Sequence, residues 1–119
     1  MAEVEASRLS PTQPIPPAAL VRRVGCPANV DPAAWYVESG AAHKQSIVRL
    51  LPADWTWSGK RVLDFGCGIG RILAQFTAEA RQTACFAGCD IDGPSIEWLS
   101  VHLAPPFEMR HTQEDPPLP

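Results

Sequence analysis

Short runs of β-branched, aromatic and other apolar residues recur in the second half of the chain, each bounded by glycine, proline or acidic residues. Such runs predict strands, and they lie at residues 61–65, 84–89 and 107–111. Between them the apolar residues change to spacings of three and four, which is typical of one buried helix face. A helix is therefore predicted at residues 69–80, and another from Gly93 to the prolines that follow residue 104.

The chain ahead of the first strand divides into two parts. Residues 1–30 carry closely spaced prolines among Ser, Thr and Gln without apolar periodicity, which predicts a flexible, Pro-rich arm. Asp31 and Pro32 then form a typical helix start, and the helix is expected to reach Leu51, loosened at Gly40. The alternation of strands with helices predicts an α/β fold, a Rossmann-like three-layer sandwich with a parallel sheet.

The loop after the first predicted strand carries the chemistry. Asp64 lies at the carboxyl end of this strand, and glycines follow at Gly66, Gly68 and Gly70. Strand, glycine-rich loop and helix, in that order, open a nucleotide site in Rossmann-like sheets. The dinucleotide pattern G-x-G-x-x-G wants its third glycine one residue later, where this chain has Arg71. Asp64 would repel a pyrophosphate and suits a cationic ligand; alternatively, it only caps the loop.

A second acidic residue, Asp90, follows the second predicted strand. A carboxylate at this place can accept hydrogen bonds from both ribose hydroxyls of a bound nucleoside. The structural alternative is a cap of the next helix, but Asp92 is the better candidate for that role, which leaves Asp90 to the ligand. Ile91 would lie against the adenine ring of such a ligand, or else in the core.

The sequence from Gly59 to Arg71, together with residues 88–92, resembles the class I S-adenosylmethionine-dependent methyltransferases. The resemblance spans roughly residues 31–119. It implies S-adenosylmethionine as the cofactor and transfer of its methyl group as the reaction. Asp64 would then lie near the methionine amino group, and Glu114 near the adenine amino group. The cofactor-binding residues implied in this way are Asp64, Gly66, Cys67, Gly68, Asp90, Ile91 and Glu114.

The same resemblance bears on domain organisation. In this family the first strand lies beside a fourth strand, which would begin shortly after Pro119, and catalytic groups commonly follow it. Residues 31–119 are therefore expected to be the N-terminal, cofactor-binding part of a methyltransferase domain, truncated after the third strand. The first strand would be left as an unpaired apolar edge, which favours self-association. No catalytic residue is predicted.

Composition and charge narrow the choice of partners. The formal net charge is −3 and no basic run interleaves with aromatic residues, so a small-molecule methyl acceptor is expected and nucleic acid is not. No apolar run is long enough to span a membrane and no secretory signal is evident, which predicts a cytoplasmic protein. The cysteines lack a C-x-x-C pair and are expected to be reduced, mostly buried thiols, with no metal bound.

Two other functions fit parts of the pattern. An NAD(P)-dependent oxidoreductase shares the expected fold and the acidic residue Asp90, but not the glycine spacing or Asp64. A truncated, non-catalytic remnant or an interaction module would keep the fold without the activity.

Overall fold

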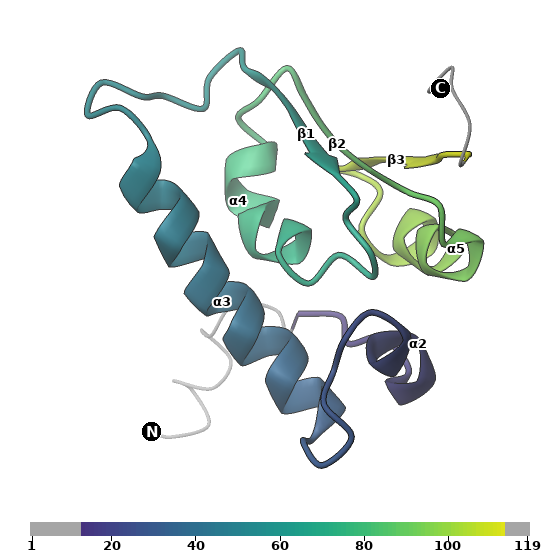
Figure 1. Ribbon diagram of the computed structural model, residues 1–119. Coiled ribbons are helices and arrows are strands. Elements are labelled where there is room, and N and C mark those ends of the chain that lie inside the picture. Colours follow the sequence, from purple (N-terminus) through teal and green to yellow (C-terminus); the bar gives the residue numbers. More distant parts are fainter. Residues whose placement is uncertain (1–12, 114–119) are drawn as a thin grey trace, which may run out of the picture.

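Three parallel strands form the sheet of this protein (Figure 1). The structure is a computed structural model, and it describes residues 13–113. The strands lie in the order β1 (Arg61–Phe65), β2 (Cys85–Asp90) and β3 (Glu108–His111). In the parallel register, Asp64 of β1 lies opposite Gly88, and Asp90 of β2 lies opposite His111. The predicted α/β class and the Rossmann-like parallel sheet are confirmed, and each strand lies within one residue of its predicted range.

The connections between the strands cover one face of the sheet. The first contains the 3-10 helix η1 (Leu73–Phe76) and α4 (Thr77–Ala80), and the second contains α5 (Gly93–His102). Both connections step in the same direction across the sheet, and parallel crossovers are right-handed, so their helices share a face. The main core lies there. It contains Leu73, Phe76, Phe86, Ile96, Leu99, Leu103 and Phe107.

On the opposite face of the sheet, within residues 13–113, the apolar side chains of β1 are exposed. Leu63 and Phe65 on β1 are 57% and 65% exposed, and only β2 pairs with β1 in this part of the chain. The described residues thus form the sheet and one helical layer, and a second layer of the expected sandwich would have to cover this face. The apolar edge predicted for the first strand is present.

The N-terminal segment differs from the predicted flexible arm over residues 13–30. It contains a short helix, α2 (Ala18–Arg23), whose Val21 side chain is fully buried. Val21 packs in a second cluster with Cys26, Tyr36 and Ile69. Alanine, leucine and arginine favour a helix once the prolines have ended at Pro17, and burial of Val21 holds it on the rest of the structure. Residues 1–12 lie outside the described part of the chain.

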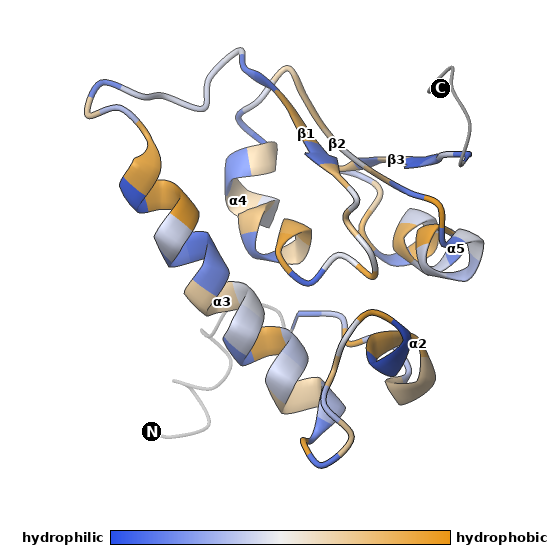
Figure 2. Cartoon of the chain, in the orientation of Figure 1, coloured by the Kyte–Doolittle hydropathy of each residue, from blue (hydrophilic) through white to orange (hydrophobic). Residues whose placement is uncertain are grey.

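The long helix α3 (Pro32–Leu50) begins as predicted, since the Ala34 N–H donates to the Asp31 carboxylate at 2.9 Å. It is not loosened at Gly40. A Cβ atom at Gly40 would lie 2.3 Å from the carbonyl oxygen of Arg71, so the glycine lets the helix approach the loop after β1 closely. Figure 2 shows the hydrophobic C-terminal turns of α3, where Ile47 lines an apolar pocket beside β1.

The helix predicted at residues 69–80 is wrong in its first part. Gly68 and Gly70 have φ angles of +56° and +78°, which no right-handed helix contains. Helical structure therefore starts only at Leu73, as a 3-10 turn. Ile69 lies in the second cluster, under α2 and α3, instead of facing the sheet with Leu73.

Candidate functional site

The candidate site lies at the carboxyl ends of β1 and β2, where the glycine loop (residues 66–71) follows β1. The backbone N–H groups of Gly66 and Cys67 both donate to the carbonyl of Cys89, at 2.8 and 2.9 Å. These bonds fold the loop back over the end of β2. The ligand-binding crevice of open α/β sheets lies at this edge.

Two glycines of the loop, Gly66 and Gly70, have different roles. Gly66 has a φ of +75°, and a Cβ atom there would meet no heavy atom within 4 Å, so its outer side is open to a ligand. Gly70 also has a positive φ, but a Cβ there would lie 2.5 Å from a methyl carbon of Leu99. Gly70 therefore allows close packing of the loop on α5.

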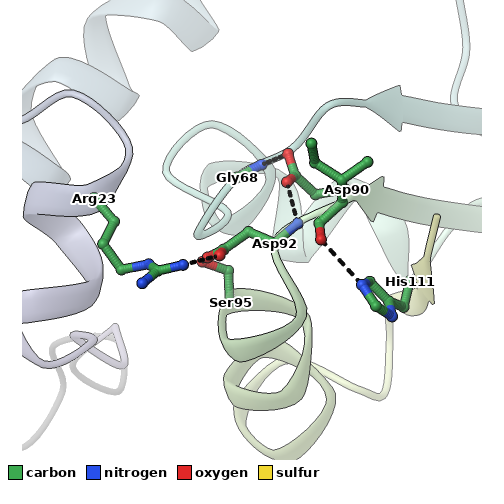
Figure 3. Close-up of polar contacts among 7 residues, drawn as sticks. Arg23, Gly68, Asp90, Asp92, Ser95 and His111 are labelled. Carbon is green, nitrogen blue, oxygen red and sulfur yellow. Dashed lines mark hydrogen bonds and ion pairs between the residues drawn. The ribbon is translucent and has the colours of Figure 1, made fainter. Parts of the chain in front are cut away.

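The Asp90 carboxylate accepts hydrogen bonds from the chain itself. This corrects the expectation that Asp92 would take the structural role and leave Asp90 to a ligand. Figure 3 shows its carboxylate between the glycine loop and the next turn: Oδ2 accepts from the Gly68 N–H and Oδ1 from the Asp92 N–H, both at 2.8 Å. Each carboxylate oxygen can accept a second hydrogen bond. Asp90 can thus shape the loop and still accept hydrogen bonds from a ribose.

Asp92 occupies the predicted cap position of α5, but its side chain bonds to other side chains. Ser95 donates to Oδ2 and Arg23 of α2 pairs with Oδ1, each at 2.5 Å (Figure 3). The hydrogen bond from Arg23, followed by that from Ser95, lowers the pKa of Asp92. This ion pair fastens α2 beside the glycine loop, where a Cβ at Gly68 would lie 3.3 Å from Val24. The contribution of α2 was missed because no local signal marks a contact 69 residues away in sequence.

Asp64 lies in a small open pocket with Gly66, Gly68 and Arg71. Its side chain is half-buried, and no group in residues 13–113 donates a hydrogen bond to it. Burial raises the pKa of Asp64, the neighbouring Asp90 raises it further, and Arg71 opposes both effects. The alternative role of capping the loop is absent from the described residues, since the loop N–H groups bond to Cys89 and Asp90 instead.

Arg71 is a site residue that the sequence marked only as a departure from the dinucleotide pattern. Its guanidinium stacks over Trp35 of α3, 5.0 Å from the ring centroid, and Nη1 lies 2.6 Å from Nδ1 of His43. Desolvation lowers the pKa of Arg71, while Asp64 raises it. Both contacts come from α3, and Trp35 and His43 lie about two helical turns apart along it. No motif at the loop itself indicates them.

The remaining predicted residues fall in different places. The Cys67 thiol is buried in the main core, and burial raises its pKa to about 12, so it is a neutral packing group at ordinary pH. Ile91 is 55% exposed beside Asp90, which rules out the core position and leaves its side chain accessible. Its carbonyl oxygen lies 3.0 Å from Nε2 of His111. Glu114 lies outside the described residues.

No family model, curated protein or solved structure matches this chain. Within residues 13–113, no group of three or more His, Cys, Asp or Glu side chains is arranged to hold a metal ion. No helix of this part of the chain has both the length and the apolar character needed to cross a membrane.

Proposed function

We propose that the chain binds S-adenosylmethionine at the glycine loop and serves as the cofactor-binding part of a methyltransferase. The observation that carries this proposal is that Asp64 is half-buried and receives no hydrogen bond from residues 13–113. Such a carboxylate favours a ligand that brings positive charge and hydrogen-bond donors to it. The ammonium group and the sulfonium centre of S-adenosylmethionine bring both.

The other residues of the site fit the same ligand. The open side of Gly66 allows the backbone to approach the ligand, and the second lone pairs of Asp90 can accept hydrogen bonds from the ribose hydroxyls. The exposed Ile91 side chain offers an apolar surface to the adenine ring. S-adenosylmethionine would supply an electrophilic methyl group, and these residues would bind and orient it for transfer. A small molecule is the proposed acceptor.

A dinucleotide is less well supported as the ligand. Its pyrophosphate would sit at the glycine loop, next to the Asp64 carboxylate, where two negative groups would repel each other in a partly desolvated pocket. This repulsion favours a ligand whose cationic end lies at the loop.

The experiment is a calorimetric binding titration of the full chain with S-adenosylhomocysteine and, separately, with NADH. Binding of the first ligand and not the second is expected. The variant Asp90→Ala should weaken S-adenosylhomocysteine binding by about 10- to 100-fold, because it removes a charged hydrogen-bond acceptor. Glu114→Ala should weaken it less. Retention of NADH in place of S-adenosylhomocysteine would favour the oxidoreductase, and equal effects of the two variants would contradict the ribose assignment.

A further inference from the structure

The turn at the end of β2 (residues 90–92) is held by contacts from several parts of the chain. The Asp90 carbonyl accepts a hydrogen bond from the Thr112 N–H at 2.9 Å. The Ile91 carbonyl oxygen lies 3.0 Å from Nε2 of His111. These two contacts come from the last residue of β3 and the residue after it. They fix the backbone of the turn that carries the proposed ribose-binding carboxylate.

Asp92, the last residue of this turn, is held by its side chain. Its Oδ2 accepts from Ser95 of α5, and its Oδ1 pairs with Arg23 of α2 (Figure 3). The backbone N–H of Asp92 donates in turn to Oδ1 of Asp90 at 2.8 Å. The Arg23 guanidinium and the Asp90 carboxylate are therefore linked through a single residue. Among the polar contacts of residues 13–113, the Arg23–Asp92 pair alone ties this turn to α2.

The charges at the turn make this pair more than a fastening. Asp90 and Asp92 bring two negative charges to it, and within residues 13–113 Arg23 is the only cation that pairs with either. Without Arg23, Asp92 would keep only the Ser95 hydroxyl, and its charge would be unbalanced beside Asp90. The turn would then be freer to shift, and the Asp90 carboxylate with it. Since the Arg23 side chain is 56% exposed, the pair is modest in strength and weakens with salt.

We infer that Arg23 is a positioning residue for ligand binding: through its ion pair with Asp92, it holds the turn so that Asp90 can accept hydrogen bonds from a ribose. The inference rests on the proposed function, from which it takes the role of Asp90. It adds a residue of the N-terminal segment to the site. Val24, which follows Arg23, lines the pocket at the glycine loop, so α2 contributes to the site through two neighbouring residues.

The test uses two ligands that share a nucleoside. Adenosine is uncharged and contains the ribose, whereas S-adenosylhomocysteine adds the charged amino-acid end. Both are titrated calorimetrically into the full chain and its variants. Arg23→Met removes the cation, Arg23→Lys keeps it, and Asp92→Asn removes the partner charge; the double variant joins the first and the third. Arg49→Met is the matched control, because it removes an equal charge from an exposed position of α3.

Arg23→Met and Asp92→Asn should each weaken the binding of both ligands by about 3- to 5-fold, the range of an exposed ion pair. The double variant should lose no more than either single variant, because the two residues act as one pair. Arg23→Lys should recover most of the loss, and Arg49→Met should match the wild type.

Salt separates this role from a merely structural one. Raising sodium chloride from about 50 mM to about 500 mM should weaken adenosine binding to the wild type by a similar factor, because the ion pair is screened. Arg23→Met should show no such loss. Wild-type affinity in Arg23→Met, additive losses in the double variant, or a loss confined to S-adenosylhomocysteine would each overturn the inference and leave the proposed function standing. If the wild type bound neither ligand, the proposed function would fail and the inference with it.

Discussion

Replacement of Gly40 by alanine sets two effects of opposite sign against each other. In the interior of a helix, alanine is favoured over glycine by about 1 kcal/mol, because glycine loses more backbone freedom on folding. At this position, however, the added Cβ would lie 2.3 Å from the carbonyl oxygen of Arg71 and 3.2 Å from its carbonyl carbon. The Cβ and the carbonyl oxygen would have to move roughly 1 Å further apart to reach an ordinary van der Waals contact.

The helix cannot move away without breaking other contacts. One turn before Gly40, the buried Tyr36 hydroxyl donates to the Ile69 carbonyl at 3.0 Å, and one turn after it Lys44 donates to the Gln75 carbonyl at 2.9 Å. Overpacking of this kind costs about 1–3 kcal/mol, and a strained hydrogen bond adds about 1 kcal/mol. After the gain in helix propensity is subtracted, Gly40→Ala should destabilise the fold by about 2 kcal/mol.

Thermal and urea unfolding followed by circular dichroism measure this effect. A loss of about 2 kcal/mol corresponds to a fall in Tm of about 8–10 °C for a chain of this size. The matched control is Ala42→Gly, at an exposed position of the same helix, which reports the propensity effect alone and should lose about 1 kcal/mol. If Gly40→Ala raised the Tm, propensity would dominate, and the close approach of α3 to the glycine loop would be refuted.

Two further predictions concern buried ionisable groups. Because burial raises the pKa of Asp64 above its usual 3.8, ionisation disfavours the folded state, so Asp64→Asn should stabilise the protein at neutral pH while weakening S-adenosylhomocysteine binding. Urea unfolding should show that the gain shrinks as the pH falls and vanishes below pH 3.8, and a loss of stability at neutral pH would contradict the reasoning. Tyr36 is the sole tyrosine, and burial raises its pKa, so an absorbance titration of the full chain should show no tyrosinate until alkali unfolds it. Formation of tyrosinate in the folded chain would disprove the burial of Tyr36. The variant Tyr36→Phe should lower the free energy of unfolding by about 1–2 kcal/mol, because it leaves the Ile69 carbonyl unpaired.

Local signals predicted the elements that are governed locally. Asp31 followed by Pro32 marks a helix start whatever the rest of the chain does, and the three β-prone runs became strands of a parallel sheet. The six-residue helix α2 was missed for the opposite reason. A helix this short is unstable alone and exists because Val21 is buried and Arg23 reaches Asp92, neither of which a sequence window contains.

The two aspartates of the site show the same difference between local signals and contacts distant in sequence. Asp64 lies one residue before the end of β1, Asp90 ends β2, and both were predicted to face a ligand. The sequence alone cannot say which of the two the backbone itself will use. Asp90 accepts N–H groups from Gly68 and Asp92 because the loop after β1 folds over the end of β2. Asp64 lies just before that loop, and the N–H groups of Gly66, Cys67 and Gly68 bond to Cys89 and Asp90 instead of to its carboxylate. Within residues 13–113, Asp64 is the one of the two carboxylates that receives no hydrogen bond, so a cationic ligand should change its energy most, and binding should be most sensitive to substitution of Asp64.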